Sequence, residues 1–183
     1  MIGTRTRPSA VLEIAQGYCT GGLSVIPIRP DGTKRPSVSW KEYQRRLPAA
    51  SELDRWFGYD TSLGVAVICG MVSGGLEVLD FDDTAAYFAW SEVIEQQAPG
   101  ILARLPTVQT PAGGFHVYYR LERPAGNKKL ALGADRATLI ETRGEGGYVL
   151  APGCPPECHE TRGLYQHISG PALTLAPRLR DLR

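Results

Sequence analysis

Two aspartates stand two residues apart where an apolar segment ends. The segment spans residues 76–81, and Asp80 and Asp82 flank Phe81 at its end. If the segment forms a β-strand, alternate side chains share a face, so the two carboxylates point the same way, about 7 Å apart. Oxygen ligands of this kind suit divalent cations, whereas burying two like charges without a cation costs free energy. The pair therefore needs a neutralising cation.

A third carboxylate belongs to a later apolar segment. On a strand, Glu141 shares a face with Leu139 and Arg143. Its partner is then either the Arg143 guanidinium or the same metal site as Asp80 and Asp82. Three carboxylates from two strands are a common minimum for two-metal phosphoryl transfer, in which cations ~3.5–4 Å apart activate the attacking oxygen and stabilise the leaving oxygen.

A histidine follows two glycines in the segment between these acids. His116 comes after Gly113 and Gly114, and on a strand it shares a face with Tyr118 and Arg120. A His and an Arg on one face, beside glycines that permit close backbone approach, could hold a phosphate chain. The alternative is an ordinary edge strand with an exposed histidine.

Soft metal ligands gather near the C-terminal end. Cys154, Cys158 and His159 could bind zinc, but a closed zinc site takes four ligands. Cys69 or His167 could complete the set. The alternative is that the cysteines pack in a stiff, proline-containing loop.

The composition indicates one globular domain. The chain has 183 residues, of which 43% are hydrophobic and 21% charged, and it has no apolar run of the ~20 residues that a membrane span needs. Four cysteines do not make a disulfide scaffold in a chain of this size, which indicates a reducing, cytoplasmic setting. Because the net charge is +1, nucleic-acid binding would depend on local basic clusters. These are Lys34-Arg35, Arg45-Arg46, Lys128-Lys129 with Arg136, and Arg178-Arg180-Arg183.

The hydrophobic pattern predicts helices and adjacent strands, which favours an α+β fold. The expected helices span residues 9–20, 51–57 and 84–97, with Ser51 as an N-cap in a capping box with Asp54, and Asp83 as the cap of the third. The expected strands span residues 23–28, 63–69, 76–81, 107–110, 115–121, 137–142, 148–151 and 164–168. Hairpin-like connections are expected at 111–114 and 143–147, a polar loop at 122–136, and the start of a helix at 177–183.

Three short motifs in a fixed order resemble those of archaeo-eukaryotic-type primases. They are Asp80-Phe81-Asp82, residues 110–120 around His116, and residues 140–152 around Glu141. The chain is similar to the primase–polymerase (prim-pol) domain at the N-terminus of plasmid and phage replication proteins. Its opening, residues 22–40, is similar as well, and the resemblance covers about residues 11–165. It implies an archaeo-eukaryotic primase-type catalytic core of mixed β-sheets flanked by helices.

The resemblance also implies roles for individual side chains. Asp80 and Asp82 match a metal-binding pair, and Glu141 matches a third acidic ligand that is often Asp in the family. His116 matches a contact to the phosphates of the incoming nucleotide. Further nucleotide contacts are expected from basic residues: Lys34, Arg120 and Arg143. The implied cofactors are two Mg²⁺ or Mn²⁺ ions.

The implied reaction is templated nucleotidyl transfer, in which a 3′-hydroxyl attacks the α-phosphate of an incoming nucleotide. The expected partners are nucleoside triphosphates, a single-stranded DNA template with its primer, and a C-terminal accessory or helicase region. We expect a monomeric catalytic domain over residues 1–176, with 177–183 leading to that region, in the cytoplasm of a bacterial host if phage-encoded. A metal-dependent nuclease or phosphohydrolase, or a non-catalytic nucleic-acid-binding module, would be compatible with the same fold. The sequence leaves de novo priming and the choice between ribo- and deoxyribonucleotides open, with Tyr118 and Tyr148 as candidates near the 2′-hydroxyl.

Overall fold

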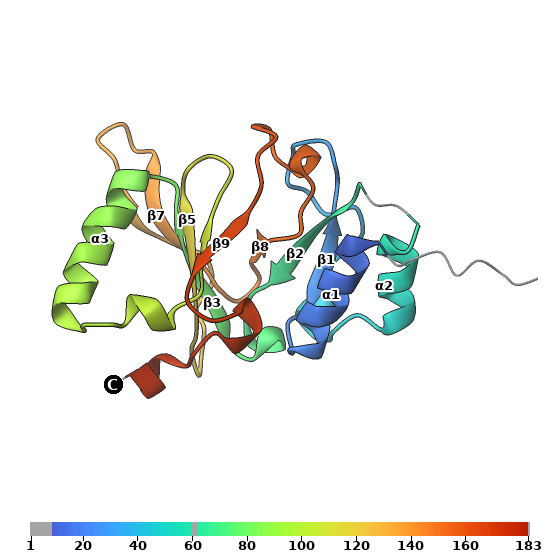
Figure 1. The fold of residues 1–183 in the computed structure, drawn as a ribbon, viewed down its shortest axis with the longest axis horizontal. Coiled ribbons are helices and arrows are strands. Elements are labelled where there is room, and N and C mark those ends of the chain that lie inside the picture. The colour runs from blue at the N-terminus through green and yellow to red at the C-terminus, as the bar shows by residue number, and fades with distance from the viewer. Residues whose placement is uncertain (1–8, 60–61, 183) are drawn as a thin grey trace, which may run out of the picture.

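The computed structural model describes residues 9–59 and 62–182, so Arg183 of the C-terminal basic cluster lies outside the described residues. The described chain folds into helices that flank two antiparallel β-sheets (Figure 1). The helices are α1 (Ala10–Thr20), α2 (Ala50–Phe57) and α3 (Thr84–Gln97). The strands are β1 (Val25–Ile28), β2 (Gly64–Ile68), β3 (Leu76–Phe81), β4 (Thr107–Gln109), β5 (Phe115–Arg120), β6 (Lys128–Leu132), β7 (Thr138–Arg143), β8 (Tyr148–Leu150) and β9 (Gln166–Ser169). The α+β prediction is confirmed.

The smaller sheet has the strand order β1-β2-β8 and lies beside α1 and α2. Every residue of β1 and β2 is buried, which explains why both strands are uninterrupted small and apolar runs rather than alternating patterns. Helix α1 begins after Ser9, whose hydroxyl accepts a hydrogen bond from the Leu12 amide at 3.1 Å. The apolar side of α1 packs into the core that this sheet shares with the inner face of the larger sheet.

The larger sheet has the strand order β6-β7-β3-β5-β4-β9, and α3 covers its outer face (Figure 1). Asp83 caps α3 as predicted, because its carboxylate accepts from the Ala86 amide at 2.6 Å. Under the helix, Tyr87 stacks on Phe115 with ring centroids 3.9 Å apart, and Phe81 completes this second core. The central strand β3 is therefore anchored from one face, which leaves its other face to position the site.

The structure corrects several expectations about local structure. Helix α2 begins at Ala50, and the carboxylate of Glu52 accepts from the Ala49 amide at 2.7 Å, so Ser51 is not the cap. The polar segment 122–136 contains the edge strand β6, whose exposed side chains carry no burial pattern. Strands β7 and β8 belong to different sheets, so residues 144–147 carry the chain from one sheet to the other instead of closing a hairpin.

The C-terminal end packs against the larger sheet. Residues 179–182 form a single 3₁₀ turn where the sequence predicted the start of a helix. Just before it, the Pro177 carbonyl accepts from the Arg120 amide at 2.8 Å. Within residues 9–59 and 62–182, no helix has the length and apolar character needed to cross a membrane.

Candidate active site

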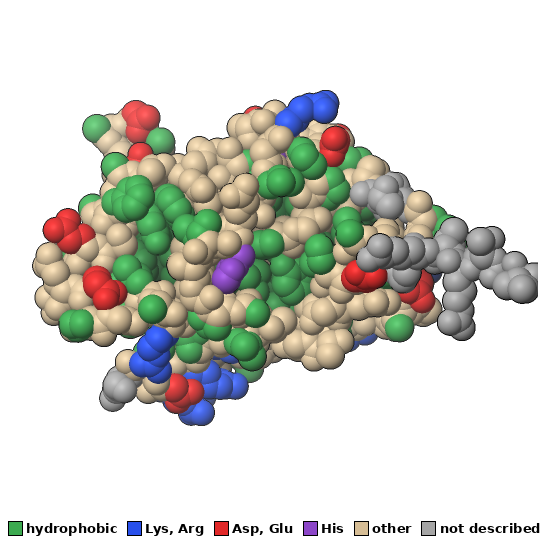
Figure 2. Space-filling view, in the orientation of Figure 1, with side chains coloured by type: hydrophobic (Ala, Val, Ile, Leu, Met, Phe, Trp, Pro, Cys, Tyr) green, Lys and Arg blue, Asp and Glu red, His purple; other side chains and the backbone are tan. Residues whose placement is uncertain are grey.

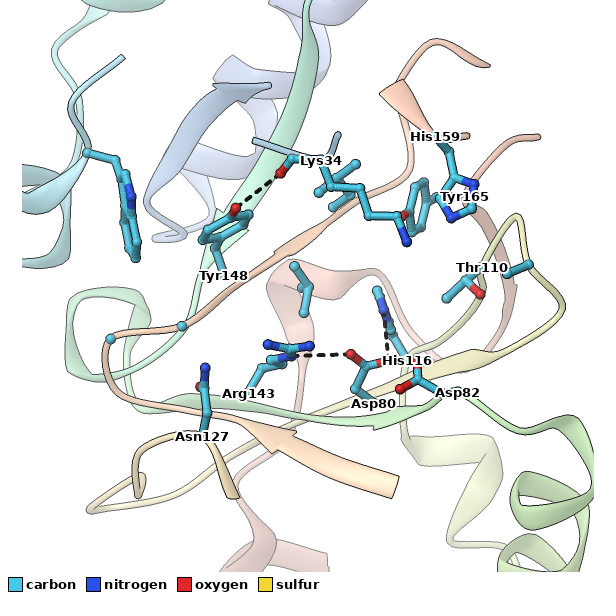
Figure 3. Close-up of a pocket in the computed structure, with 16 residues that line it drawn as sticks. Lys34, Asp80, Asp82, Thr110, His116, Asn127, Arg143, Tyr148, His159 and Tyr165 are labelled. Carbon is cyan, nitrogen blue, oxygen red and sulfur yellow. Dashed lines mark hydrogen bonds and ion pairs between the residues drawn. The ribbon is translucent and has the colours of Figure 1, made fainter. Parts of the chain in front are cut away.

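Asp80 lies at the centre of the site because β3 is the strand between β5 and β7. The register places Asp80 opposite His116 on one side and Glu141 on the other. His116 Nε2 lies 3.4 Å from Asp80 Oδ1, and Arg143 Nε lies 3.2 Å from Asp80 Oδ2 (Figure 3). Burial by itself raises the pKa of Asp80, but the charges and hydrogen bonds of His116 and Arg143 outweigh it and hold the pKa below its ordinary value. Asp80 is therefore held ionised inside the protein.

Arg143 bridges two of the three predicted carboxylates. Its Nε bonds to Asp80, and its Nη2 forms an ion pair with Glu141 Oε1. Glu141 and Arg143 alternate on β7 and so share a face, as the sequence predicted. Of the two partners considered for Glu141, the structure shows the guanidinium.

The other two carboxylates are less well neutralised. Burial raises the pKa of Asp82, and repulsion from Asp80 adds to it. Burial also raises the pKa of Glu141, where the attraction of Arg143 is opposed by repulsion from Asp80 and Asp82. The three acids therefore interact electrostatically, and the single guanidinium leaves negative charge uncompensated.

The donor chemistry of these acids fits a divalent cation. Carboxylate oxygens are the ligands that Mg²⁺ and Mn²⁺ prefer, and a cation would relieve the repulsion that raises the two pKa values. In the part of the chain that the structure describes, no three His, Cys, Asp or Glu side chains are arranged to hold a metal ion together. Arg143 lies between Asp80 and Glu141 instead, so its guanidinium would have to move for both acids to bind one cation.

A cavity of about 380 Å³ opens above this cluster. Both sheets contribute to its wall, because β3, β5 and β7 come from the larger sheet and β8 from the smaller. Figure 3 shows Lys34 extending across the cavity opposite Asp80, with His159 and Tyr165 beside it. The other lining residues are Trp40, Asp82, Thr110, Ala112, His116, Asn127, Arg143, Gly146, Gly147, Tyr148, Val149 and Leu150.

Lys34 is held at the cavity by its backbone. Its φ of 61° lies in the left-handed region that residues with side chains rarely adopt. The Tyr148 hydroxyl donates to the Lys34 carbonyl at 3.0 Å, and the neighbouring Thr33 forms a β-bridge with His159. These contacts bring the predicted basic residue over the carboxylates from a loop distant in the sequence.

The glycines before His116 allow the close approach that the sequence predicted. A Cβ on Gly114 would lie 2.2 Å from the Phe81 carbonyl oxygen, so any larger residue would push the β4–β5 loop away from β3. Gly113 has a φ of +89° in the same turn. His116 is thereby fixed beside Asp80, and its Nδ1 lies 3.4 Å from the hydroxyl of the fully buried Tyr118. Tyr148 lines the cavity, whereas Tyr118 is fully buried and is not one of the lining residues.

Asn127 is a cavity residue that the sequence reasoning missed. Its Oδ1 accepts from the Gly144 amide at 3.2 Å. A backbone amide can only donate, so this bond fixes the orientation of the carboxamide and leaves its NH₂ group for a ligand. Figure 3 shows the Asn127 side chain beside Arg143 at the cavity wall. Asn127 lies in a polar segment that was expected to be a loop, next to a glycine. No pattern in that segment indicates a ligand-binding side chain.

Arg120 lies away from the cavity, at the opposite end of β5. Its Nε donates to the Ala176 carbonyl at 3.0 Å and its Nη2 to the Thr174 carbonyl at 3.2 Å. A third bond reaches the Ser73 carbonyl. The prediction that Arg120 contacts the nucleotide is therefore corrected, because its guanidinium holds the C-terminal segment against the sheet.

Of the two alternatives considered for Cys154 and Cys158, the structure shows packing in the core. Cys154 Sγ donates to the Val65 carbonyl at 3.0 Å, and Cys158 Sγ lies 3.9 Å from the Ser62 carbonyl, both in the buried core. His159 lines the cavity instead, and its Nδ1 accepts from the Thr161 amide at 3.1 Å. Cys158 ends a 3₁₀ turn and packs in the core, whereas His159 already has extended backbone and lies at the cavity wall.

The comparison with protein families agrees with this geometry. The family described as bifunctional DNA primase/polymerase, N-terminal, matches residues 15–179, which is most of the chain. No curated protein sequence matches the chain at a significant level. Proteins of this family are nucleotidyltransferases whose substrates are DNA and nucleotides. The chain belongs to the bifunctional DNA primase/polymerase (Prim-Pol) N-terminal family.

Proposed function

We propose that the cavity carries out template-directed nucleotidyl transfer by a two-metal mechanism, in which nucleoside triphosphates extend a 3′-hydroxyl. The observation that supports this best is the convergence of Asp80, Asp82, His116 and Arg143 at one cavity, with Glu141 opposite Asp80 on β7 and paired to Arg143. We also propose a role in the replication of a phage or mobile element, which is supported by the resemblance of the motifs.

The acidic residues would hold the metals. Asp80, Asp82 and Glu141 offer the oxygen ligands, and bound Mg²⁺ or Mn²⁺ would lower the pKa of the attacking hydroxyl and neutralise charge on the phosphates. In this proposal Arg143 is released from Asp80 and Glu141 and turns to a phosphate of the nucleotide. An arginine suits that contact because its planar guanidinium can donate two parallel hydrogen bonds to phosphate oxygens.

The basic residues would orient the triphosphate. His116 can donate from its ring to a phosphate oxygen, since Gly114 and Asp80 fix its position. Lys34 supplies a positive charge from the opposite wall. The proposal needs no nucleophilic side chain, because the attacking group belongs to the primer, and so the protein contributes by positioning and by electrostatic stabilisation.

A primer-extension assay with Mn²⁺ tests the proposal. Asp80→Asn and Asp82→Asn keep the side-chain size and remove the charge, so we expect each to lower extension by about 10²–10³-fold or more. Glu92→Gln is the matched control, because Glu92 is exposed on α3, away from the cavity, and should leave extension unchanged. Wild-type protein that degrades the template without extending the primer would show a nuclease instead. Wild-type protein that binds DNA and does neither would show a non-catalytic module.

A further inference from the structure

A second hollow, the arginine groove, lies at the end of β5 opposite the cavity. It has a volume of about 260 Å³ and joins the segment after β5 to the C-terminal segment. Its lining includes Arg120, Glu122, Arg123, Arg178, Leu179 and Arg180. Figure 2 shows basic side chains gathering along the lower edge of the molecule, where the C-terminal segment lies. The sequence marked only the C-terminal arginines as a cluster, and the fold adds two more from β5 and the residues after it.

The positive charge of the arginine groove is only partly compensated. Arg180 pairs with Glu122 and with Asp181, and all three are exposed. Across residues 9–59 and 62–182, neither Arg123 nor Arg178 forms an ion pair with an acidic side chain. Like charges held this close favour an anionic ligand, which would lower their mutual repulsion.

The floor of the arginine groove is rigid. Arg120 donates to three backbone carbonyls, those of Ser73, Thr174 and Ala176, which fixes its guanidinium. Burial lowers the pKa of Arg120, and the charge of Arg178 lowers it further. The backbones of these two arginines also form a β-bridge. The positive charges are therefore presented by a fixed scaffold and not by a loose tail.

The arginine groove lies within reach of the catalytic cavity. Arg120 and His116 occupy the same face of β5, four residues apart, which corresponds to about 13 Å along the strand. This separation is short beside an oligonucleotide. Because the fully buried Tyr118 lies between the two residues on this face, a DNA strand that contacts both places would run around the surface of the molecule.

We propose that the arginine groove binds the phosphodiester backbone of single-stranded DNA, outside the catalytic cavity. Arginine is well suited to phosphate oxygens, and contacts of this kind position a strand without reading its sequence. A peptide partner fits less well, since protein interfaces are usually anchored by buried aromatic or large apolar groups, and Leu179 is the largest apolar side chain exposed in the groove. The identification of the strand as the template rests on the proposed polymerase function.

Salt-dependent binding of a fluorescent oligo(dT) tests the proposal. The variant Arg123→Gln/Arg178→Gln removes two charges that have no ion pair in the described chain, so it should fold normally. We expect its DNA affinity to fall roughly tenfold at low salt, and the slope of log K against log[salt] to decrease in magnitude by about 0.7 for each phosphate that the protein no longer neutralises. Lys41→Gln/Arg55→Gln is the charge-matched control, because both residues are exposed and lie outside the arginine groove, the cavity and the other basic clusters.

The outcomes separate this inference from the proposed function. An arginine-groove variant that equals the control in affinity and slope overturns the inference, as does wild-type protein that does not bind oligo(dT). If wild type binds through the arginine groove but extends no primer, the polymerase proposal fails and the DNA site stands. In the extension assay, the arginine-groove variant should raise the KM for template–primer and leave the KM for nucleotide unchanged. Asp80→Asn should keep DNA binding while extension is lost.

Discussion

Arg143 is the side chain on which the charge balance of the cavity depends. In the free protein its guanidinium contacts Asp80 and Glu141, the same acids that would hold a cation. The side chain is one-third exposed, so it can leave toward the cavity without breaking the core. A cation and this guanidinium therefore compete for the same carboxylates. A nucleotide phosphate that attracts Arg143 would help the metal to bind, and the metal would help the nucleotide in turn.

We expect Arg143→Gln to bind Mn²⁺ more tightly than wild type when no nucleotide is present. Removal of the competing charge beside Asp80 and Glu141 should tighten the Kd by about tenfold, or roughly 1.4 kcal/mol. Titration followed by the EPR signal of free Mn²⁺ measures this directly. Lys129→Gln is the control, because Lys129 also acts on Glu141 but from the exposed edge strand β6, and its effect should be small. Unchanged or weaker Mn²⁺ binding by Arg143→Gln would contradict the competition.

Asn127 allows the structural and ligand-binding roles of one side chain to be separated. Asn127→Asp keeps an oxygen to accept from the Gly144 amide but loses the NH₂ donor that faces the cavity. We expect the KM for nucleotide to rise by about 3–10-fold with little change in Tm. Asn127→Leu should lower the Tm as well, because the Gly144 amide then loses its partner. Steady-state kinetics and thermal unfolding of both variants check this, and an unchanged KM in Asn127→Asp would exclude a nucleotide contact.

At the level of elements, β3 separates the chemistry from the supporting core. Its even-numbered residues face the smaller sheet and the cavity, where Asp80 lies. Its odd-numbered residues face α3, and there Glu77 accepts from the Tyr119 hydroxyl at 2.7 Å and from the Ala125 amide at 3.1 Å. Strand β3 thus carries two buried carboxylates on opposite faces. Asp80 lies at the cavity, whereas Glu77 forms hydrogen bonds within the supporting core.

Helix α2 depends on one carboxylate for its first turn. Glu52 accepts from the Ala49 amide, from Arg46 and from the Tyr43 hydroxyl, and chiefly the Arg46 contact lowers its pKa from 4.5 to about 2. A lowered pKa means that this stabilisation is fully present above about 4.5 and is lost as the pH falls through about 2. We expect Glu52→Gln to cost on the order of 1 kcal/mol at pH 7, which lowers the Tm by about 2–4 °C.

The pH dependence makes the Glu52 prediction specific. The difference in Tm between wild type and Glu52→Gln should shrink as the pH falls from about 4.5 toward about 2, because the wild-type carboxyl is then protonated too. Thermal unfolding followed by circular dichroism across this range measures the difference. A difference that stays constant with pH would show that the charge of Glu52 does not stabilise the helix.

For the whole molecule, the sequence predicted the features that follow from periodic side-chain patterns within single elements. It missed the features that depend on contacts between strands distant in the sequence. Strands with buried runs were found, and so was the alternation that puts Glu141 beside Arg143. Strand β6 was missed, and Asn127 with it, because an exposed edge strand needs no apolar pattern. Arg120 was expected at the nucleotide because it shares a strand face with His116. Alternation along a strand does not show which end of the strand lies at the cavity. The pairing of β7 and β8 with different sheets depends on contacts that no local pattern records.

Because the cavity is lined by both sheets, a ligand bound there should stabilise the whole fold. Asp80 and His116 come from the larger sheet, whereas Tyr148 and the loop of Lys34, which it holds, belong to the smaller sheet and its connections. A nucleotide with Mn²⁺ that contacts both walls binds only the folded arrangement of the two. At about 100 times its Kd it should stabilise the fold by about 2.7 kcal/mol and raise the Tm by about 5–10 °C in a single transition.

Differential scanning calorimetry with Mn²⁺ and a nucleoside triphosphate measures that shift. The matched control is Asp80→Asn/Asp82→Asn, which keeps the cavity but removes two of the three carboxylates, and it should lose most of the shift. The nucleoside without phosphates should also shift the Tm less, because Lys34, His116 and Arg143 would have no anion to contact. A full shift in the Asp80→Asn/Asp82→Asn protein would mean that the nucleotide binds elsewhere. Two separate transitions would mean that the cavity does not couple the sheets.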